Sequence, residues 1–216
     1  MKEDWINELL VFFEKIARLA YINVLWIAFT VLGLVIFGFM PATAAMFSVL
    51  RAQIRGKQDT TVFQHFWKVY RKEFVKSNVL GLLLSIPGWI IYIDLFVFNF
   101  GSTAGMQMLH ACLYIVGLLF LMGLAFIFPL YVQYELKTTK YVGLAFLLVF
   151  AAPFRALLLL ILGYGIFFFM SKMPILIVFF LGSTVSSLWL MITLPAFQKI
   201  ERQHRRPNQK SQPIIE

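Results

Sequence analysis

Residues 38–78 read GFMPATAAMFSVLRAQIRGKQDTTVFQHFWKVYRKEFVKSN and lie between two long apolar runs. Basic residues greatly outnumber acidic ones in this stretch, which contains Arg51, Arg55, Lys57, Lys68, Arg71, Lys72 and Lys76 against Asp59 and Glu73. In membrane proteins, Lys and Arg concentrate in the cytoplasmic loops that adjoin the spans. The stretch therefore predicts the orientation of the chain, with an amphipathic loop of residues 42–78 in the cytoplasm.

The composition indicates an integral membrane protein. Apolar residues make up 61% of the 216 residues, charged residues make up 13%, and the mean hydropathy is +0.82. Soluble domains are about half apolar and about a quarter charged. Because a run of about twenty apolar residues spans a bilayer, the sequence predicts spans over residues 19–39, 79–100, 108–131, 154–170 and 175–194. We expect an all-α, polytopic membrane helix bundle that forms one domain over residues 1–200, with added amphipathic interfacial helices.

The net charge of +9 does not indicate a nucleic-acid partner, because the basic residues are confined to zones beside apolar runs. Juxtamembrane Lys and Arg attract anionic lipid by about 1 kcal/mol per residue, so the expected partner is the anionic inner leaflet. Cys112 is the single cysteine, which excludes a disulfide framework and a thiolate metal set. We expect no cofactor and no metal.

Residues 1–18, MKEDWINELLVFFEKIAR, have the periodicity of an amphipathic helix. Their acidic residues are not typical of a signal peptide. The helix lies in the membrane interface or extends the first span, and both alternatives stay open. Pro41 predicts a helix break, because proline removes a backbone donor. At about 1.5 Å per residue, residues 42–55 reach only about 21 Å, so we expect a half-helix that leaves the membrane or re-enters it.

A second amphipathic helix is predicted to begin at Thr61. Thr61 and Gln64 fit the capping-box spacing. The helix places Phe63, Phe66, Trp67, Tyr70 and Phe74 on one side, and Lys68, Arg71, Lys72 and Lys76 on the other. A basic helix with an aromatic face suits the lipid headgroup layer.

The predicted spans decide where the two ends of the chain lie. Residues 201–216 are a basic tail, which we expect to be cytoplasmic and disordered. With the loop of residues 42–78 also inside, five spans place the N-terminus outside. If the segment around Pro41 crossed as well, there would be six spans and a cytoplasmic N-terminus.

Polar residues within the spans are few, and each has a structural explanation. Asn23 and Asn78 are expected to form hydrogen bonds between helices. Asp94 lies late in the second span, where its carboxylate reaches the headgroups, although an intramembrane acid is by default a functional candidate. Arg155 begins the fourth span and is expected to extend its guanidinium to the interface.

The sequence contains none of the motifs that carry catalysis. It has no His-Glu-x-x-His motif, no paired intramembrane Asp, no Ser/His pair at plausible depth and no Gly-rich phosphate loop. An enzyme is therefore not expected.

Residues 19–81 resemble a known family. The residues that carry the resemblance are Asn23, Val24, Leu25, Trp26, Gly33, Gly38, residues 41–45, Arg51, Gly56, Phe66, Trp67, Tyr70, Phe74, Ser77 and Asn78. This set resembles the YesL-like family of bacterial integral membrane proteins, a domain of unknown function. The resemblance implies a bacterial cell membrane protein that occurs beside sugar ABC transporters and glycoside hydrolases, and hence an accessory role in carbohydrate uptake.

Two functions fit these expectations. The first is a non-enzymatic accessory protein that binds a membrane partner such as a sugar ABC transporter. Its interaction residues would be Arg51, Phe66, Trp67, Tyr70 and Arg71, since aromatic residues and Arg are favoured at interfaces, although the same residues could anchor the loop to lipid. The alternative is a small transporter or permease subunit with a site at helices kinked by Pro41, Pro87 and Pro129.

Overall fold

The computed structural model describes residues 2–56, 60–97 and 103–209, with side chains between residues 5 and 197. The described residues form helices and no strand, in the order α1 (Lys2–Leu32), α2 (Ile36–Ile54), α3 (Val62–Phe96), α4 (Ala104–Gln133), α5 (Thr138–Ala151), α6 (Pro153–Met170) and α7 (Pro174–Gln209). Five segments among them are long and apolar enough to cross a membrane: Trp5–Leu32, Val62–Phe96, Ala104–Gln133, Pro153–Met170 and Pro174–Phe197. The predicted all-α, multi-pass membrane bundle is confirmed.

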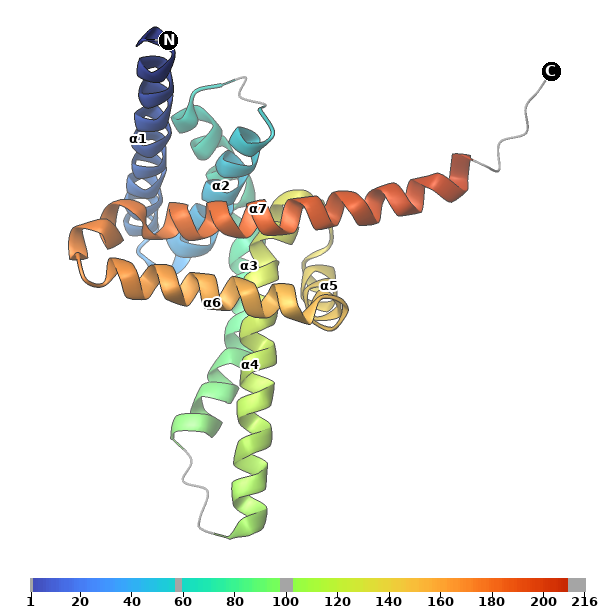
Figure 1. The fold of residues 1–216 in the computed structure, drawn as a ribbon. Coiled ribbons are helices and arrows are strands. Elements are labelled where there is room, and N and C mark those ends of the chain that lie inside the picture. Colours follow the sequence, from blue (N-terminus) through green and yellow to red (C-terminus); the bar gives the residue numbers. More distant parts are fainter. Residues whose placement is uncertain (1, 57–59, 98–102, 210–216) are drawn as a thin grey trace, which may run out of the picture.

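The helices are arranged as three hairpins. The hairpins are α1–α2, α3–α4 and α6–α7. In each of them, two helices that are consecutive in the sequence are in contact. Figure 1 shows α6 and α7 running side by side across the upright α4, while the far halves of α3 and α4 extend beyond the other helices. The short helix α5 packs on α4, α3 and α6. Apolar side chains such as Leu82, Trp89 and Met108 are exposed on the extended halves, as expected of surfaces that face lipid.

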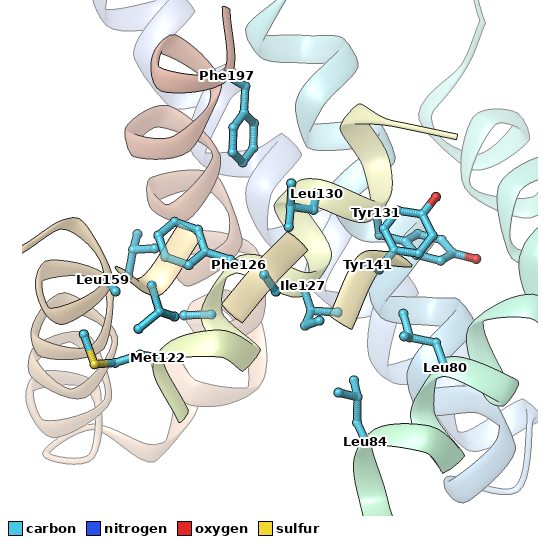
Figure 2. Close-up of a cluster of buried hydrophobic side chains, with 14 of the residues drawn as sticks. Leu80, Leu84, Met122, Phe126, Ile127, Leu130, Tyr131, Tyr141, Leu159 and Phe197 are labelled. Atoms are coloured by element: carbon cyan, nitrogen blue, oxygen red, sulfur yellow. The ribbon is translucent and has the colours of Figure 1, made fainter. Parts of the chain in front are cut away.

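Two buried clusters identify α2 and α4 as the central helices. Phe126, Ile127 and Leu130 of α4 lie in one cluster with side chains from α3, α5, α6 and α7 (Figure 2). In the second cluster, α2 packs against α1, α3 and α7. All of residues 41–50 except Ser48 are buried. Small residues let neighbouring membrane helices approach closely, and the alanines of residues 42–45 have this effect in α2.

The first helix ends earlier than the sequence predicts. α1 ends at Leu32, and the turn contains Leu34 and Val35 with φ of 58° and 65°. A Cβ atom on Gly38 would lie 2.3 Å from the carbonyl oxygen of Thr30, so the two backbones approach this closely only because glycine has no side chain. The predicted break at Pro41 is therefore wrong, and Pro41 lies inside α2.

Asn78 explains why α2 continues through Pro41. Proline has no N–H, so the carbonyl of Phe37, four residues earlier, lacks its helical donor. The side-chain amide of Asn78 donates to this carbonyl at 2.9 Å, and also to the carbonyl of Phe74 at 2.8 Å. Asn78 therefore replaces the missing donor and ties α3 to α2, as expected of an amide that links two helices.

This arrangement predicts a coupling between Asn78 and Pro41. Asn78→Ala should lower the free energy of unfolding by about 1 kcal/mol, because the carbonyl of Phe37 loses its donor. In a Pro41→Ala background, the N–H of residue 41 satisfies this carbonyl, so the same substitution should cost at least about 0.5 kcal/mol less. Equilibrium unfolding of the four proteins in micelles measures the coupling. An equal cost in both backgrounds would contradict it.

The structure also defines three further boundaries. Residues 5–18 continue into the first span as part of α1, so the alternative in which they extend that span is correct. The amphipathic helix that begins at Thr61 and the second span form the single helix α3, in which the predicted N-cap is confirmed because the Thr61 hydroxyl accepts from the N–H of Gln64. Residues 201–209 of the tail, predicted to be disordered, are helical in α7, while residues 210–216 lie outside the described residues.

Candidate functional site: a polar pocket between α2, α3 and α4

A pocket of about 380 Å³ lies where α2, α3, α4 and the start of α5 meet. We call it the polar pocket, and its lining residues are Ala44, Ser48, Arg51, Val69, Lys72, Glu73, Lys76, Tyr131, Val132, Gln133, Tyr134, Glu135 and Tyr141. Its polar lining contrasts with the surrounding apolar helices.

Helical periodicity brings these side chains together. Ser48 and Arg51 are three residues apart near the end of α2, and Lys72 and Lys76 are four residues apart on α3, so each pair shares one helix face. α4 contributes residues 131–133 from its last turn, and α5 contributes Tyr141 from its first turn. The sequence predicts that α3 has a basic face. No feature of the sequence indicates that this face lies beside the end of α4.

Two tyrosines and a lysine form the inner wall. The rings of Tyr131 and Tyr141 lie side by side with centroids 5.0 Å apart, at the edge of the buried cluster (Figure 2). The Lys76 ammonium is 5.3 Å from each ring centroid, within the range of a cation–π interaction. The Tyr141 hydroxyl donates to the Tyr134 carbonyl at 2.6 Å and accepts from the Leu136 N–H at 2.9 Å. These bonds fix the connection between α4 and α5.

Carboxylates lie at the side and the rim of the pocket. Glu73 accepts a hydrogen bond from the Tyr131 hydroxyl at 2.7 Å, and its side chain is 17% exposed. The Lys72 ammonium is 3.8 Å from both Glu73 and Glu135, and the Glu135 side chain is 94% exposed. An ion pair as exposed as Lys72–Glu135 contributes at most about 1 kcal/mol. The rim therefore contains charged groups that are available to solvent.

Two contacts near the pocket were not expected from the sequence. Arg55 donates to the Gln133 side chain at 2.8 Å, which ties α2 to α4. Ser48 Oγ lies 3.0 Å from His65 Nε2. Within the described ranges, no carboxylate forms a hydrogen bond with His65. We interpret the pair as a hydrogen bond that joins α2 to α3.

The predicted aromatic face of α3 divides between the core and the surface. Phe66 is 0% and Tyr70 is 4% exposed, and both rings pack on Phe29 of α1 at centroid distances of 5.1 and 5.0 Å. The Tyr70 hydroxyl also donates to the Phe29 carbonyl at 3.2 Å. The prediction of a headgroup-facing surface is therefore wrong for these two residues. Trp67 is 42% exposed, and Arg71 is exposed as well.

The other predicted site residues lie outside the polar pocket. Asn23 is fully buried, donates to the Val178 carbonyl at 2.6 Å and accepts from the Ser183 N–H at 2.9 Å. It therefore joins α1 to α7, the interhelical role expected for it. Asp94 is half-buried near the end of α3, and Arg155 is exposed in the first turn of α6. In the part of the chain that the structure describes, no group of three or more His, Cys, Asp or Glu residues could hold a metal ion.

Comparisons with known proteins identify the family. A family model described as a protein of unknown function, DUF624, matches residues 19–95. The chain is similar to three uncharacterized proteins of Bacillus subtilis (strain 168). It is 38% identical to YteU over 206 residues, covering 95% of this chain and 92% of YteU, and 36% identical to YesV over 195 residues, covering 89% and 93%.

The third relative is YesL, to which the chain is 30% identical over 191 residues, covering 88% of this chain and 90% of YesL. No solved structure matches the chain. Because the similarity to these relatives extends over nearly the whole chain, this protein belongs to the YesL-like family of membrane proteins, the family of the DUF624 model.

Proposed function

We propose that this protein is a non-enzymatic accessory protein of the bacterial cell membrane that binds a partner membrane protein at the cytoplasmic face. The supporting observation is a row of exposed side chains at the polar end of α3. We call this row the outer stripe, and it consists of Phe63, Trp67, Arg71 and Val75, spaced four residues apart. Trp and Arg, together with Tyr, are enriched among the residues that contribute strongly to protein–protein binding.

The packing of Trp67 within the outer stripe favours a protein partner over lipid anchoring. The Trp67 ring packs on Phe29 and Tyr70, with centroids 5.6 and 6.2 Å away. A side chain held in one position before binding loses little conformational entropy when it binds. A tryptophan that only anchors a helix in the headgroup layer requires no such fixed position.

The family suggests what kind of partner this is. The resemblance to YesL-like proteins implies a connection with sugar ABC transporters and glycoside hydrolases. We therefore propose a membrane component of carbohydrate uptake as the partner. A transporter function for this chain itself has less support, because the amide of Asn23 already forms hydrogen bonds with α7.

The proposed orientation follows from the hairpins. The turn between α1 and α2 reverses the chain, and Arg18 and Tyr21 of α1 line one hollow with residues 60–64. The N-terminus and the basic α2–α3 connection therefore share one side, which we propose is the cytoplasm. Of the 19 Lys and Arg residues, Lys172 alone falls in the sequence that connects the two helices of a hairpin (residues 33–35, 97–103 and 171–173). This proposal replaces the expected external N-terminus with a cytoplasmic one, and it gives the chain six crossings with α2 counted.

Photocrosslinking in native membranes tests the partner. A photoreactive amino acid at Trp67 or Arg71 should form a crosslink to a protein in cells grown on the sugar that induces uptake. The matched control is Phe154, which is 88% exposed on α6 and lies outside the stripe. We expect crosslinks from the control position to contain lipid alone. Recovery of lipid alone from Trp67 and Arg71 would contradict the proposed function.

A further inference from the structure

We propose that the polar pocket binds the phosphate group of an anionic ligand. The pocket contains three cationic side chains, Arg51, Lys72 and Lys76, contributed by α2 and α3. Two carboxylates, Glu73 and Glu135, also line it, so the lining has a net charge of +1 (three positive minus two negative). Hydrogen bonds from Arg or Lys to phosphate are about twice as strong as those between neutral groups.

Lys76 is the central residue of this proposal. Within the described residues, no carboxylate oxygen lies within 4.0 Å of its ammonium, whose contacts are the rings of Tyr131 and Tyr141 and the Tyr141 hydroxyl at 3.4 Å. Aromatic rings orient a lysine without neutralising its charge. The ammonium can therefore donate to an anion that enters the pocket.

Neither of the two carboxylates pairs with the Lys76 ammonium, so an anion can approach it. Glu73 already accepts from the Tyr131 hydroxyl and lies 3.8 Å from Lys72. Glu135 is 94% exposed at the rim, where it lies 3.8 Å from the same lysine. Lys72 therefore pairs with both acids and offsets one of their two negative charges, and the Lys76 ammonium keeps its positive charge inside the pocket.

The pocket lies at the polar end of apolar helices, a level that both lipid headgroups and soluble molecules can reach. The apolar helix α4 ends at Gln133, beside the pocket. A phosphate at this level comes either from a lipid headgroup or from a soluble phosphate ester, and the same groups would bind both. The proposal does not rest on the proposed partner, because the outer stripe and the pocket lie on different faces of α3.

Purified full-length protein in detergent provides the test, with two probes. Native mass spectrometry detects phospholipid that copurifies, and thermal unfolding detects stabilisation by inorganic phosphate. Loss of one charge-assisted hydrogen bond costs about 1.5–3 kcal/mol, so Lys76→Gln should weaken binding at least about tenfold. The matched control is Lys140→Gln, because Lys140 is exposed on α5 and outside the pocket lining. Lys72→Gln, at a side chain that is 67% exposed, serves as a second variant in case Lys76→Gln fails to fold.

Each outcome either identifies the source of the bound phosphate group or overturns the proposal. Phospholipid retained by the wild type and the control but lost from the pocket variants identifies a lipid headgroup. Stabilisation by inorganic phosphate that disappears in the same variants identifies a soluble ligand. The proposal is overturned if neither probe binds the wild type, or if the pocket variants bind as well as Lys140→Gln.

Discussion

Gly38→Ala should prevent the α1–α2 hairpin from forming and cause a large loss of folded protein. The added Cβ atom would lie 2.3 Å from the Thr30 carbonyl oxygen and 2.7 Å from the Phe29 carbonyl oxygen. Both are backbone atoms, so no side-chain rotation relieves the clash. Overpacking in a core typically costs about 1–3 kcal/mol, and more where the backbone must move. We expect this substitution to exceed that range, because the turn positions α2 in the second buried cluster.

Recovery of monodisperse protein in mild detergent, together with its unfolding midpoint, measures the effect. Gly165→Ala is the matched control, since among the described residues only its chain neighbours and its own helix backbone lie near the Cβ position on this glycine. The control should behave like the wild type or be slightly more stable, because alanine is the better helix former by about 1 kcal/mol. Equal yields and midpoints for the two variants would show that the close approach of α1 and α2 is not required.

The sequence predicts the helices well because the apolar runs are long and helix formation depends mainly on residues that are close together in the chain. The predicted range of residues 154–170 nearly coincides with α6, and Thr61 is the N-cap of α3. The turn at Gly33 was missed, since it depends on two backbones meeting rather than on a local signal. The effect of Pro41 was misjudged because the compensating donor, Asn78, lies on another helix.

The candidate site was only partly predictable. The periodicity of α3 correctly separates its aromatic and basic residues, but it does not reveal what covers each face. Phe29 on α1 covers Phe66 and Tyr70, so these two belong to the core and not to an interface. The polar pocket was missed because no sequence motif includes Glu73, Tyr131 and Tyr141. These residues come together only when α4 and α5 pack beside α3.

The orientation of the hairpins predicts an all-or-none pattern of thiol labelling. Cys112 is the single cysteine and is exposed, so Cys112→Ala provides a background without native thiols. Asn7→Cys reports the N-terminal segment, Thr60→Cys the α2–α3 connection and Ser171→Cys the α6–α7 tip, and all three positions are exposed. A maleimide that cannot cross the membrane should label residue 171 in intact cells. It should label residues 7 and 60 only after the cells are permeabilised.

The most direct test of the account is therefore labelling of Asn7→Cys and Thr60→Cys in intact cells. We expect both thiols to be protected, because α1 and α2 form a hairpin whose two open ends share one side, which we propose is the cytoplasm. External labelling of residue 7 alone would show that α1–α2 is not such a hairpin in the membrane and would restore five crossings. External labelling of residue 60 would reverse the whole orientation, and the proposed cytoplasmic partner surface would be ruled out with it.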